Sequence, residues 1–510
     1  MAIKQRISPW TLFEKSLEKY PGNPCLFFNE DTYTYEQAAD QIMYLEKILA
    51  AFDFMIGGIY LPNSPEFIFS FLSLNRLGKI SVPLSYQLIK KSLSDVIQYA
   101  DIEILITDPP GLKKLEDSGQ DTSLKAVILC DEGKYTPIPF NAPVNGPVKK
   151  AVSLPEDTFG ICFTSGTTQL PKGVIIPNAS IAGNALAVSH VLNFKSHDRF
   201  LIPRPMSQAG PIAGDILMTL SAGGSIVILK DLFHPAIFFK TIQNSKVSTS
   251  LLINTMLNLL LRYPRREMYD TTSLKRLIFG GMAADGQIVK QALAAFPGVA
   301  VYSTYGMTEA CTRVSFMERR GLELYPESIG KPIQGCRITI RDNTGAEVPV
   351  NTSGNVFIES DYLMAGYYKH ESLSEQSLTD YGYKSGDRGY YNEEGVYFIC
   401  GRNDSVIIQA GNNIYPPEIE GIIRTHKAVA DTAVAGIPDA LLGQKAVAFV
   451  VLRKTAELSA PDFFKWCHEN LEHKKLPREV IFLEDIPRTE SGKHDYKALT
   501  ALYSTIKPAG

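Results

Sequence analysis

Short apolar runs alternate with helical stretches along most of the first 330 residues, and this alternation constrains the fold more than any other feature. Residues 57–84, GGIYLPNSPEFIFSFLSLNRLGKISVPL, contain an apolar run, a turn at residues 63–65, a helical stretch and a second apolar run. Such a segment is typical of the strand–helix–strand unit of a parallel sheet. The pattern returns at residues 225–231, 248–264 and 274–306. Repeated units of this kind predict layered α/β architecture.

After about residue 330, short strand-like pieces replace the alternation of apolar runs and helical stretches. Short strand-like pieces, RITIRD, GNVFIES and GVYFICG, are separated by Gly, Asn and Asp turns and predict a β-rich appendage. A fresh strand, a proline turn and a helix follow Gly401. Because 510 residues exceed the ~250–300 at which a single core stops growing, we expect more than one folding unit. We predict an α/β fold with a large N-terminal domain of layered sheets and a β-rich appendage, residues 1–403, and a small C-terminal α+β domain, residues 404–510.

The composition is that of a soluble globular protein, with 45% hydrophobic and 21% charged residues. A net charge of -3 without a long basic run argues against a nucleic-acid partner. No apolar run reaches the ~18 residues of a membrane span, and the N-terminal MAIKQRISPW lacks the apolar core of a signal peptide. The seven cysteines include no CxxC pair, so we expect a reducing, cytoplasmic location. A monomer and a homodimer both agree with the sequence.

The stretch TSGTTQLPKG, residues 164–173, follows the apolar run FGICF. It is not a Walker A loop, because that motif requires Gly-Lys-[Ser/Thr], whereas here the glycine follows Lys172. Hydroxyl groups and free backbone N–H groups suit phosphate oxygens, and the lysine adds positive charge. A polar surface turn would have the same composition. The phosphate-binding hypothesis involves Thr164, Ser165, Gly166, Thr167, Thr168 and Lys172.

Four further motifs follow in order: YGMTEA at 305–310, YKSGDRGYYNEEGVYFICGRND at 383–404, AGNNIYPPEIE at 410–420 and PRTESGK at 487–493. With TSGTTQLPKG they make the chain resemble the adenylate-forming (AMP-binding) superfamily, which comprises acyl-CoA synthetases, peptide-synthetase adenylation domains and luciferases. The motifs are most similar to those of the acyl-CoA ligase branch. The resemblance implies that the chain uses ATP, Mg²⁺, a small carboxylic acid, and either coenzyme A or the phosphopantetheine arm of a separate carrier protein.

The resemblance assigns the catalytic roles to Thr164, Glu309 and Lys493. Thr164 and Glu309 would hold Mg²⁺, for which a carboxylate oxygen is a suitable hard ligand. Lys493 would bridge the attacking carboxylate and the α-phosphate, where negative charge builds as pyrophosphate leaves. Outside this motif context, Glu309 would be an ordinary surface acid and Lys493 a solvated lysine. His494, the next residue, is expected to be exposed.

The same resemblance implies a nucleoside site. Tyr305 would stack on adenine, the backbone of Gly280–Ala283 would line the other side of the base, and Asp387 would accept both ribose hydroxyls. Arg402 would add a second ribose or phosphate contact. A lone tyrosine is otherwise more often part of a core, and an Asp after Gly more often a turn residue. The residues expected to contact the nucleotide or coenzyme A are Thr164, Ser165, Gly166, Thr167, Thr168, Lys172, Gly281, Met282, Ala283, Tyr305, Gly306, Thr308, Asp387, Arg402, Ala410, Gly411 and Lys493.

A moving C-terminal domain is also implied by the resemblance. It would carry Lys493 into the site for adenylation and then rotate about a hinge at Asp404. Rotation would bring the loop of Ala410 and Gly411 to the site, where small residues let a pantetheine arm pass. The hinge and this loop are therefore expected to serve the second half of the reaction.

The acyl pocket is expected to involve Gln208, Ala209, Gly210, Gly280 and Met307. The acyl-CoA branch usually has a histidine or an aromatic residue where this chain has Gln208, and this departure favours a polar or unusually shaped acid. Ser385 stands where threonine is commoner and keeps the hydroxyl group.

The predicted function is ATP-dependent conversion of a carboxylic acid to an acyl-adenylate, with release of pyrophosphate, followed by transfer of the acyl group to the thiol of coenzyme A. The sequence NIYPPEIE resembles the CoA-ligase version of its motif and favours this acceptor. One alternative is a stand-alone adenylation enzyme that loads a carrier protein. A more remote alternative is a non-catalytic nucleotide-binding relative, against which the joint presence of Glu309, Asp387, Arg402 and Lys493 argues.

Overall fold

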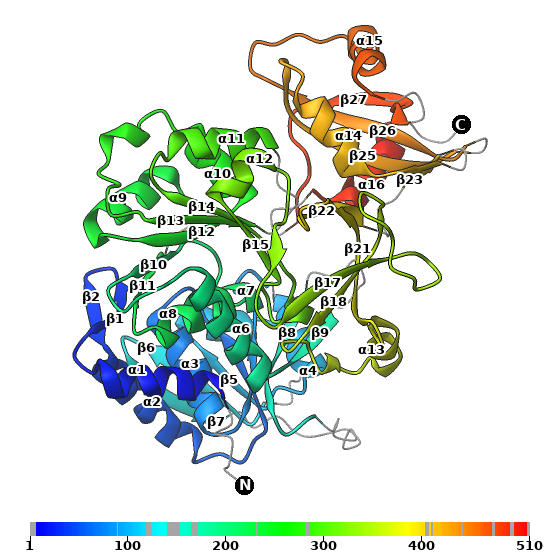
Figure 1. The fold of residues 1–510 in the computed structure, drawn as a ribbon. Coiled ribbons are helices and arrows are strands. Elements are labelled where there is room, and N and C mark those ends of the chain that lie inside the picture. Colours follow the sequence, from blue (N-terminus) through cyan, green and yellow to red (C-terminus); the bar gives the residue numbers. More distant parts are fainter. Residues whose placement is uncertain are drawn as a thin grey trace.

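The computed structural model of the chain describes residues 7–88, 90–118, 124–139, 154–164, 172–230, 233–280, 286–402, 407–409, 412–439, 442–471, 475–489 and 494–506. Within these ranges the strands form four sheets, and Figure 1 shows three of them in a large N-terminal body and the fourth in a smaller C-terminal unit. The predicted fold class is confirmed.

The first sheet of the N-terminal body has the strand order β19-β9-β8-β4-β3-β5-β6-β7. The predicted unit at residues 57–84 is present in it, because β3 pairs in parallel with β4 and α3 connects the two. The helix starts at a proline after Ser64, where a missing N–H costs nothing. The bounds are β3 Ile56–Tyr60, β4 Ile80–Pro83, β5 Ile104–Thr107, β6 Ala126–Asp131, β7 Lys134–Pro139, β8 Thr158–Thr164, β9 Lys172–Pro177 and β19 Gly366–Tyr367.

The second sheet has the order β16-β15-β14-β13-β12-β10-β11-β1-β2. Its strands β10 to β14 pair in parallel, as the repeated units predict. The bounds are β1 Pro24–Phe28, β2 Asp31–Thr34, β10 Arg199–Ile202, β11 Ser225–Ile228, β12 Thr249–Ile253, β13 Arg276–Gly280, β14 Ala300–Tyr305, β15 Ser315–Glu318 and β16 Lys331–Pro332.

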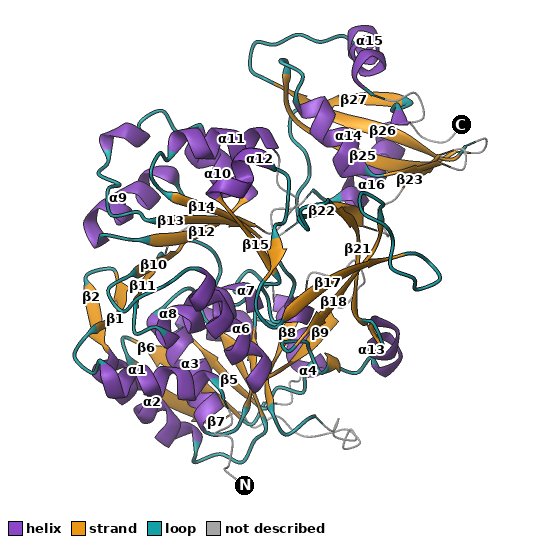
Figure 2. Cartoon of the chain, viewed as in Figure 1, coloured by secondary structure: helices purple, strands orange, loops and turns teal. Residues whose placement is uncertain are grey.

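Helices cover both sheets (Figure 2). One buried apolar cluster includes Phe71 of α3, Phe159 of the first sheet and Phe200 of the second, so the two sheets share a core. The helices of this body are α1 Pro9–Lys19, α2 Tyr35–Leu49, α3 Pro65–Arg76, α4 Lys90–Tyr99, α5 Pro109–Glu116, α6 Asn178–Val191, α7 Ala209–Pro211, the π-helix η1 Ile212–Leu217, α8 Met218–Ser221, α9 Pro235–Ser245, α10 Asn254–Leu261, η2 Arg266–Met268, α11 Gly286–Ala295, η3 Thr308–Ala310, α12 Arg319–Leu324 and α13 Glu371–Ser377. Of the helices that the structure describes, none has both the length and the apolar character that crossing a bilayer demands.

The appendage predicted after residue 330 is an antiparallel sheet of the order β17-β18-β21-β20, with β22 paired to β21. The strands are β17 Cys336–Arg341, β18 Gly354–Ser360, β20 Leu378–Thr379, β21 Gly382–Tyr391 and β22 Tyr397–Arg402. This sheet connects the body to the C-terminal unit, since β22 ends at Arg402.

The C-terminal unit is a sheet of the order β24-β23-β26-β25, with β27 paired to β26. Its elements are β23 Ile407–Gln409, β24 Asn412–Ile414, α14 Pro416–Arg424, β25 Val429–Asp439, β26 Gly443–Leu452, α15 Ala460–Asn470, β27 Glu479–Leu483 and α16 Tyr496–Ile506. Phe463 of α15 and Phe449 of β26 belong to two apolar clusters built from residues of this unit. The predicted domain boundary and the Asp404 hinge lie at residues 403–406, outside the described residues, and stay predictions.

Candidate active site

The two described ends of the TSGTTQLPKG segment meet at one edge of the first sheet. Strand β8 ends at Thr164, β9 begins at Lys172, and these two residues are directly paired in an antiparallel register. The Thr164 hydroxyl group donates to the Lys172 carbonyl oxygen at 3.5 Å. The predicted strand FGICF therefore ends at Thr164, where the TSGTTQLPKG segment begins. Thr164 lies beside Lys172, near the end of the same segment.

Tyr367 joins this edge to Glu309. Its strand β19 pairs with β9 at Val174, and its hydroxyl group donates to Glu309 Oε1 at 2.9 Å. The ammonium group of Lys172 lies 5.7 Å from the centre of the same ring, close enough for a cation–π interaction. Burial and the nearby Glu309 carboxylate raise the pKa of Tyr367, so the phenol keeps its proton and remains a donor. Tyr367 was not predicted from the sequence, because only the pairing of β19 with β9 brings it to the site.

The turn after β14 is tight because of its glycine. A Cβ atom on Gly306 would lie 1.8 Å from the Thr312 carbonyl oxygen, so no other residue fits there. Cys311 has a φ of 47° and Thr312 a φ of 146°. Such angles are unfavourable for residues with a side chain. Gly306 and these two unusual conformations lie on either side of Thr308 and Glu309, which form the short helix η3 two residues after the strand ends.

Tyr305 and Asp387, the residues predicted to contact the nucleoside, are hydrogen-bonded to each other. The Tyr305 hydroxyl group at the end of β14 donates to Asp387 Oδ2 at 2.5 Å. The Ser385 hydroxyl accepts from the Asp387 N–H at 3.1 Å and donates to the Val356 carbonyl at 3.0 Å. Burial and the Asp387 charge raise the pKa of Tyr305 well above its usual value, which keeps the phenol protonated. Arg402 Nε lies 4.0 Å from Asp387 Oδ1 on the paired strand β22.

Of the five residues predicted for the acyl pocket, three lie at the start of a helical segment, one ends β13, and one lies between β14 and η3. Gln208 is exposed and directly precedes α7, Ala209 is buried, and Gly210 is half-buried. Gly280 ends β13, where a Cβ atom would lie 2.7 Å from the Thr304 carbonyl, so glycine allows β13 and β14 to approach. Met307 is half-buried and packs against the shared core.

Three buried charged residues lie beside this segment, and sequence reasoning missed all of them. Arg204 follows β10, Asp215 belongs to the π-helix η1, and Arg313 follows the η3 turn. Arg204 Nη2 donates to Asp215 Oδ2 at 2.6 Å, whereas Arg313 Nη2 lies 3.5 Å from Asp215 Oδ1. A Cβ atom on Gly210 would lie 3.4 Å from Arg204 Nη1 and 3.7 Å from Arg313 Nη1. These three residues come together only in the folded chain, so no local sequence motif predicts the cluster.

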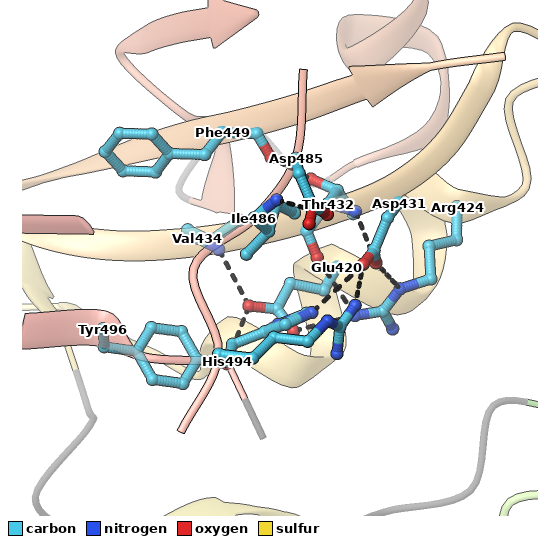
Figure 3. A network of polar contacts seen from close by, with 11 residues as sticks. Glu420, Arg424, Asp431, Thr432, Val434, Phe449, Asp485, Ile486, His494 and Tyr496 are labelled. Carbon is cyan, nitrogen blue, oxygen red and sulfur yellow. Dashed lines mark hydrogen bonds and ion pairs between the residues drawn. The ribbon is translucent and has the colours of Figure 1, made fainter. Parts of the chain in front are cut away.

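A polar network in the C-terminal unit surrounds Asp431 of β25 (Figure 3). Arg488 and His494 both contact Asp431 Oδ2, His494 through Nε2 at 3.4 Å. Arg488 and His494 also form an isolated antiparallel bridge to each other. Arg488 and His494, which lie on either side of Lys493 in the sequence, thus both contact the Asp431 carboxylate. His494 is 5% exposed, so the expectation that it would be exposed is wrong: its contact with Asp431 draws it inward.

On the other side of the network, Glu420 of α14 joins three elements. Its Oε1 atom accepts from the Val434 N–H at 2.8 Å and from the Tyr496 hydroxyl group at 3.0 Å. Its Oε2 atom lies 3.1 Å from Arg424 Nη2, and Arg424 Nε lies 3.6 Å from Asp431 Oδ1. These contacts connect α14, β25 and α16.

Several predicted site residues lie outside the described residues, and their roles stay predictions. They are Ser165, Gly166, Thr167, Thr168, Gly281, Met282, Ala283, Asp404, Ala410, Gly411 and Lys493.

Residues 13–368 match the family model described as AMP-binding enzyme. The chain belongs to this family. Residues 418–493 match the model described as AMP-binding enzyme C-terminal domain. The predicted superfamily is therefore confirmed.

Individual relatives match nearly the whole chain. An indoleacetate–CoA ligase of Aromatoleum aromaticum is 27% identical over 96% of both chains. A 2-succinylbenzoate–CoA ligase of Bacillus cereus is 28% identical over 93% of this chain and 94% of its own. The solved structure of the anthranilate CoA ligase AuaEII in complex with anthranoyl-AMP has a TM-score of 0.87 at 22% identity, covers 98% of each chain, and shows the shared fold.

Proposed function

We propose that this protein activates a carboxylic acid with ATP, releases pyrophosphate, and transfers the acyl group from the resulting acyl-adenylate to coenzyme A. The enzyme class, an AMP-forming acid–thiol ligase, is confirmed by the family and by the two CoA-ligase relatives. The observation that carries the proposal is the segment from Tyr305 to Glu309. Tyr305 contacts Asp387 at the expected nucleoside end, and Glu309 contacts Tyr367 beside Lys172 at the expected phosphate end.

The donor set of the site fits Mg²⁺. Glu309 supplies a carboxylate and Thr164 a hydroxyl oxygen, and Mg²⁺ commonly binds one or two carboxylates together with substrate phosphates. When bound, Mg²⁺ would neutralise phosphate charge.

The chain's own residues would bind and orient the nucleotide. The Ser385 hydroxyl group accepts from the main-chain N–H of Asp387, and the Tyr305 hydroxyl group donates to the Asp387 carboxylate, which would also accept the ribose hydroxyls. Tyr305 would present its ring to adenine, and Arg402 would add positive charge at the ribose or phosphates. Lys493 would stabilise the charge that develops when the carboxylate attacks the α-phosphate.

We propose coenzyme A, rather than a carrier protein, as the acceptor, and a cytoplasmic location. The motif NIYPPEIE and the two CoA-ligase relatives support the acceptor. The cysteine pattern, without a CxxC pair, supports the compartment. The acids in the relatives' names contain aromatic rings, so aromatic acids belong in the first substrate panel.

Product analysis tests the proposal. The purified protein is incubated with ATP, Mg²⁺ and a panel of aromatic and aliphatic acids, with and without coenzyme A, and the nucleotide products are separated. We expect AMP and pyrophosphate, with a thioester formed only when coenzyme A is present. ADP and phosphate as the products would contradict adenylation, and an acyl-adenylate that forms but yields no thioester when coenzyme A is present would contradict the acceptor.

A further inference from the structure

The buried cluster of Arg204, Asp215 and Arg313 carries more positive than negative charge. Its residues are 8%, 0% and 8% exposed, respectively. Two guanidinium groups share one carboxylate, so the cluster is positive whether Asp215 is ionised or protonated. A buried charge without a partner costs several kcal/mol, so proteins keep one where something else supplies the opposite charge.

Arg313 is the less satisfied of the two arginines. Arg204 Nη2 lies 2.6 Å from Asp215 Oδ2, whereas Arg313 Nη2 lies 3.5 Å from Asp215 Oδ1. Among the described residues, Arg313 Nε and Nη2 have no hydrogen-bond partner. Burial and the charge of Arg204 lower the pKa of Arg313 to about 10, which leaves it charged at neutral pH. Its main chain is fixed by Asn184, which bonds both its N–H and its carbonyl group.

The cluster lies between the two segments expected to form the acyl pocket. On one side, Gly210 and Gly214 face the guanidinium groups, and a Cβ atom on Gly214 would lie 2.9 Å from Arg313 Nε. On the other side, a Cβ atom on Gly306 would lie 3.0 Å from the Arg313 Cα atom. Glycines in both segments thus bring the backbone close to Arg313, and the positive charge adjoins Gln208–Gly210 as well as the turn of Met307.

We propose that the acid this enzyme activates carries a second carboxylate, and that Arg313 binds it while Arg204 and Asp215 hold Arg313 in place. This inference rests on the proposed function and adds the substrate class. A carboxylate suits the site because a guanidinium group offers two parallel N–H donors to its two oxygens. Burial strengthens the pairing, since a charge pair interacts more strongly away from water. A neutral acid of the same shape would leave the cluster with its surplus charge.

Matched pairs of substrates test the proposal. The probes are the linear diacids from succinate to suberate and the three benzenedicarboxylates, each compared with its monomethyl ester, in which one carboxylate is neutral. We expect at least one diacid to have a kcat/KM about a hundredfold above that of its ester, as for a charged group left unpaired in a buried site. If every ester is activated as well as its diacid, the inference is overturned while the proposed ligase function stands. If no acid at all releases pyrophosphate, the proposed function itself fails.

Variants assign the preference to Arg313. Arg313→Met keeps much of the side-chain volume without the charge, and we expect it to lose the diacid preference while retaining activity on the monomethyl esters. Arg313→Lys should restore part of the preference. The control is Arg276→Met. Arg276 Nη1 lies 3.2 Å from Oδ2 of the fully buried Asp198, so this variant also removes an arginine that pairs with a buried aspartate. We expect Arg276→Met to keep the preference for diacids.

Two results would overturn the assignment. One is an unchanged ratio of diacid to ester in Arg313→Met; the other is an equal loss with diacids and esters, which would place Arg313 in a step common to all acids. If Arg313→Met does not fold, the ratio of kcat/KM for diacid to ester is compared between the wild type and Arg313→Lys. A lower ratio in Arg313→Lys supports the assignment and an equal ratio overturns it, since lysine keeps the charge but not the planar pair of donors.

Discussion

At the scale of single residues, Tyr367 connects the two ends of the expected phosphate site. Its hydroxyl group reaches Glu309 and its ring faces Lys172, although the three residues are far apart in the sequence. Sequence motifs predicted Thr164, Lys172 and Glu309, because each lies in a recognisable local pattern. Tyr367 lies in no such pattern and became visible only through strand pairing. The same holds for Arg204, Asp215 and Arg313, which come together only in the folded chain.

Tyr367→Phe should lower the adenylation rate about tenfold and raise the Mg²⁺ concentration needed for half-maximal rate, because a hydrogen bond to a charged group contributes on the order of 1.5–3 kcal/mol. The ring that faces Lys172 is kept, so folding should change little. Pyrophosphate release measured across a Mg²⁺ series checks this. Tyr391→Phe is the control, because it removes a hydroxyl group that donates to the Val348 carbonyl in the appendage. Equal Mg²⁺ profiles for Tyr367→Phe and the wild type would contradict the role.

At the scale of elements, the apolar patterns predicted the order and type of the strands and helices well. The unit at residues 57–84 and the parallel strands β10 to β14 are examples, since burial on both faces leaves long apolar runs in the sequence. The inward position of His494 was not predictable in this way. It depends on Asp431, which lies on a different strand, and on the bridge to Arg488.

Asp431 should make stability depend on pH at the acidic end. Burial alone would raise its pKa, but the hydrogen bond and charge of His494, with Arg424 and Arg488, outweigh burial and lower the pKa from 3.8 to about 2. A carboxyl group with a lowered pKa in the folded state stabilises the protein above its unfolded pKa, near 4, and loses this contribution as the pH falls towards 2. The contribution is on the order of 2 kcal/mol.

The free energy of unfolding of the full chain, measured between pH 6 and 3, checks this expectation. Asp431→Asn should be less stable than the wild type at pH 6, and the difference should shrink as the pH falls. Asp380→Asn, which changes an exposed carboxylate of the appendage, serves as the control. A difference between Asp431→Asn and the wild type that stays constant over this range would contradict the assignment.

At the scale of the whole molecule, the expected mechanism uses the C-terminal unit at two different times. This unit has its own apolar clusters, and β22 and α14 lie on either side of the predicted hinge at Asp404. Such a unit can turn without unfolding, as hinged domains do. The superfamily resemblance predicted this mechanism from sequence, whereas the charge cluster beside the acyl segment, which concerns the choice of acid, needed the structure.

Lys493→Ala should lose adenylation by orders of magnitude and keep thioester formation, because the lysine acts only while the carboxylate attacks the α-phosphate. Each tenfold loss corresponds to ~1.4 kcal/mol of transition-state stabilisation. The two half-reactions are measured separately, the second with pre-made acyl-adenylate and coenzyme A. Lys497→Ala, a lysine on α16, is the control for both. Equal damage to both half-reactions in Lys493→Ala would show that the two steps do not use the C-terminal unit at different times.

Labelling the carboxylate oxygen shows whether the acid is activated as an acyl-adenylate. An acid labelled with ¹⁸O in its carboxylate is converted in the presence of ATP, Mg²⁺ and coenzyme A, and the products are analysed by mass spectrometry. The account predicts that AMP carries one ¹⁸O atom, because the carboxylate oxygen that attacks the α-phosphate stays on it when the thiol displaces AMP. Unlabelled AMP, or ¹⁸O found in inorganic phosphate beside ADP, would contradict it.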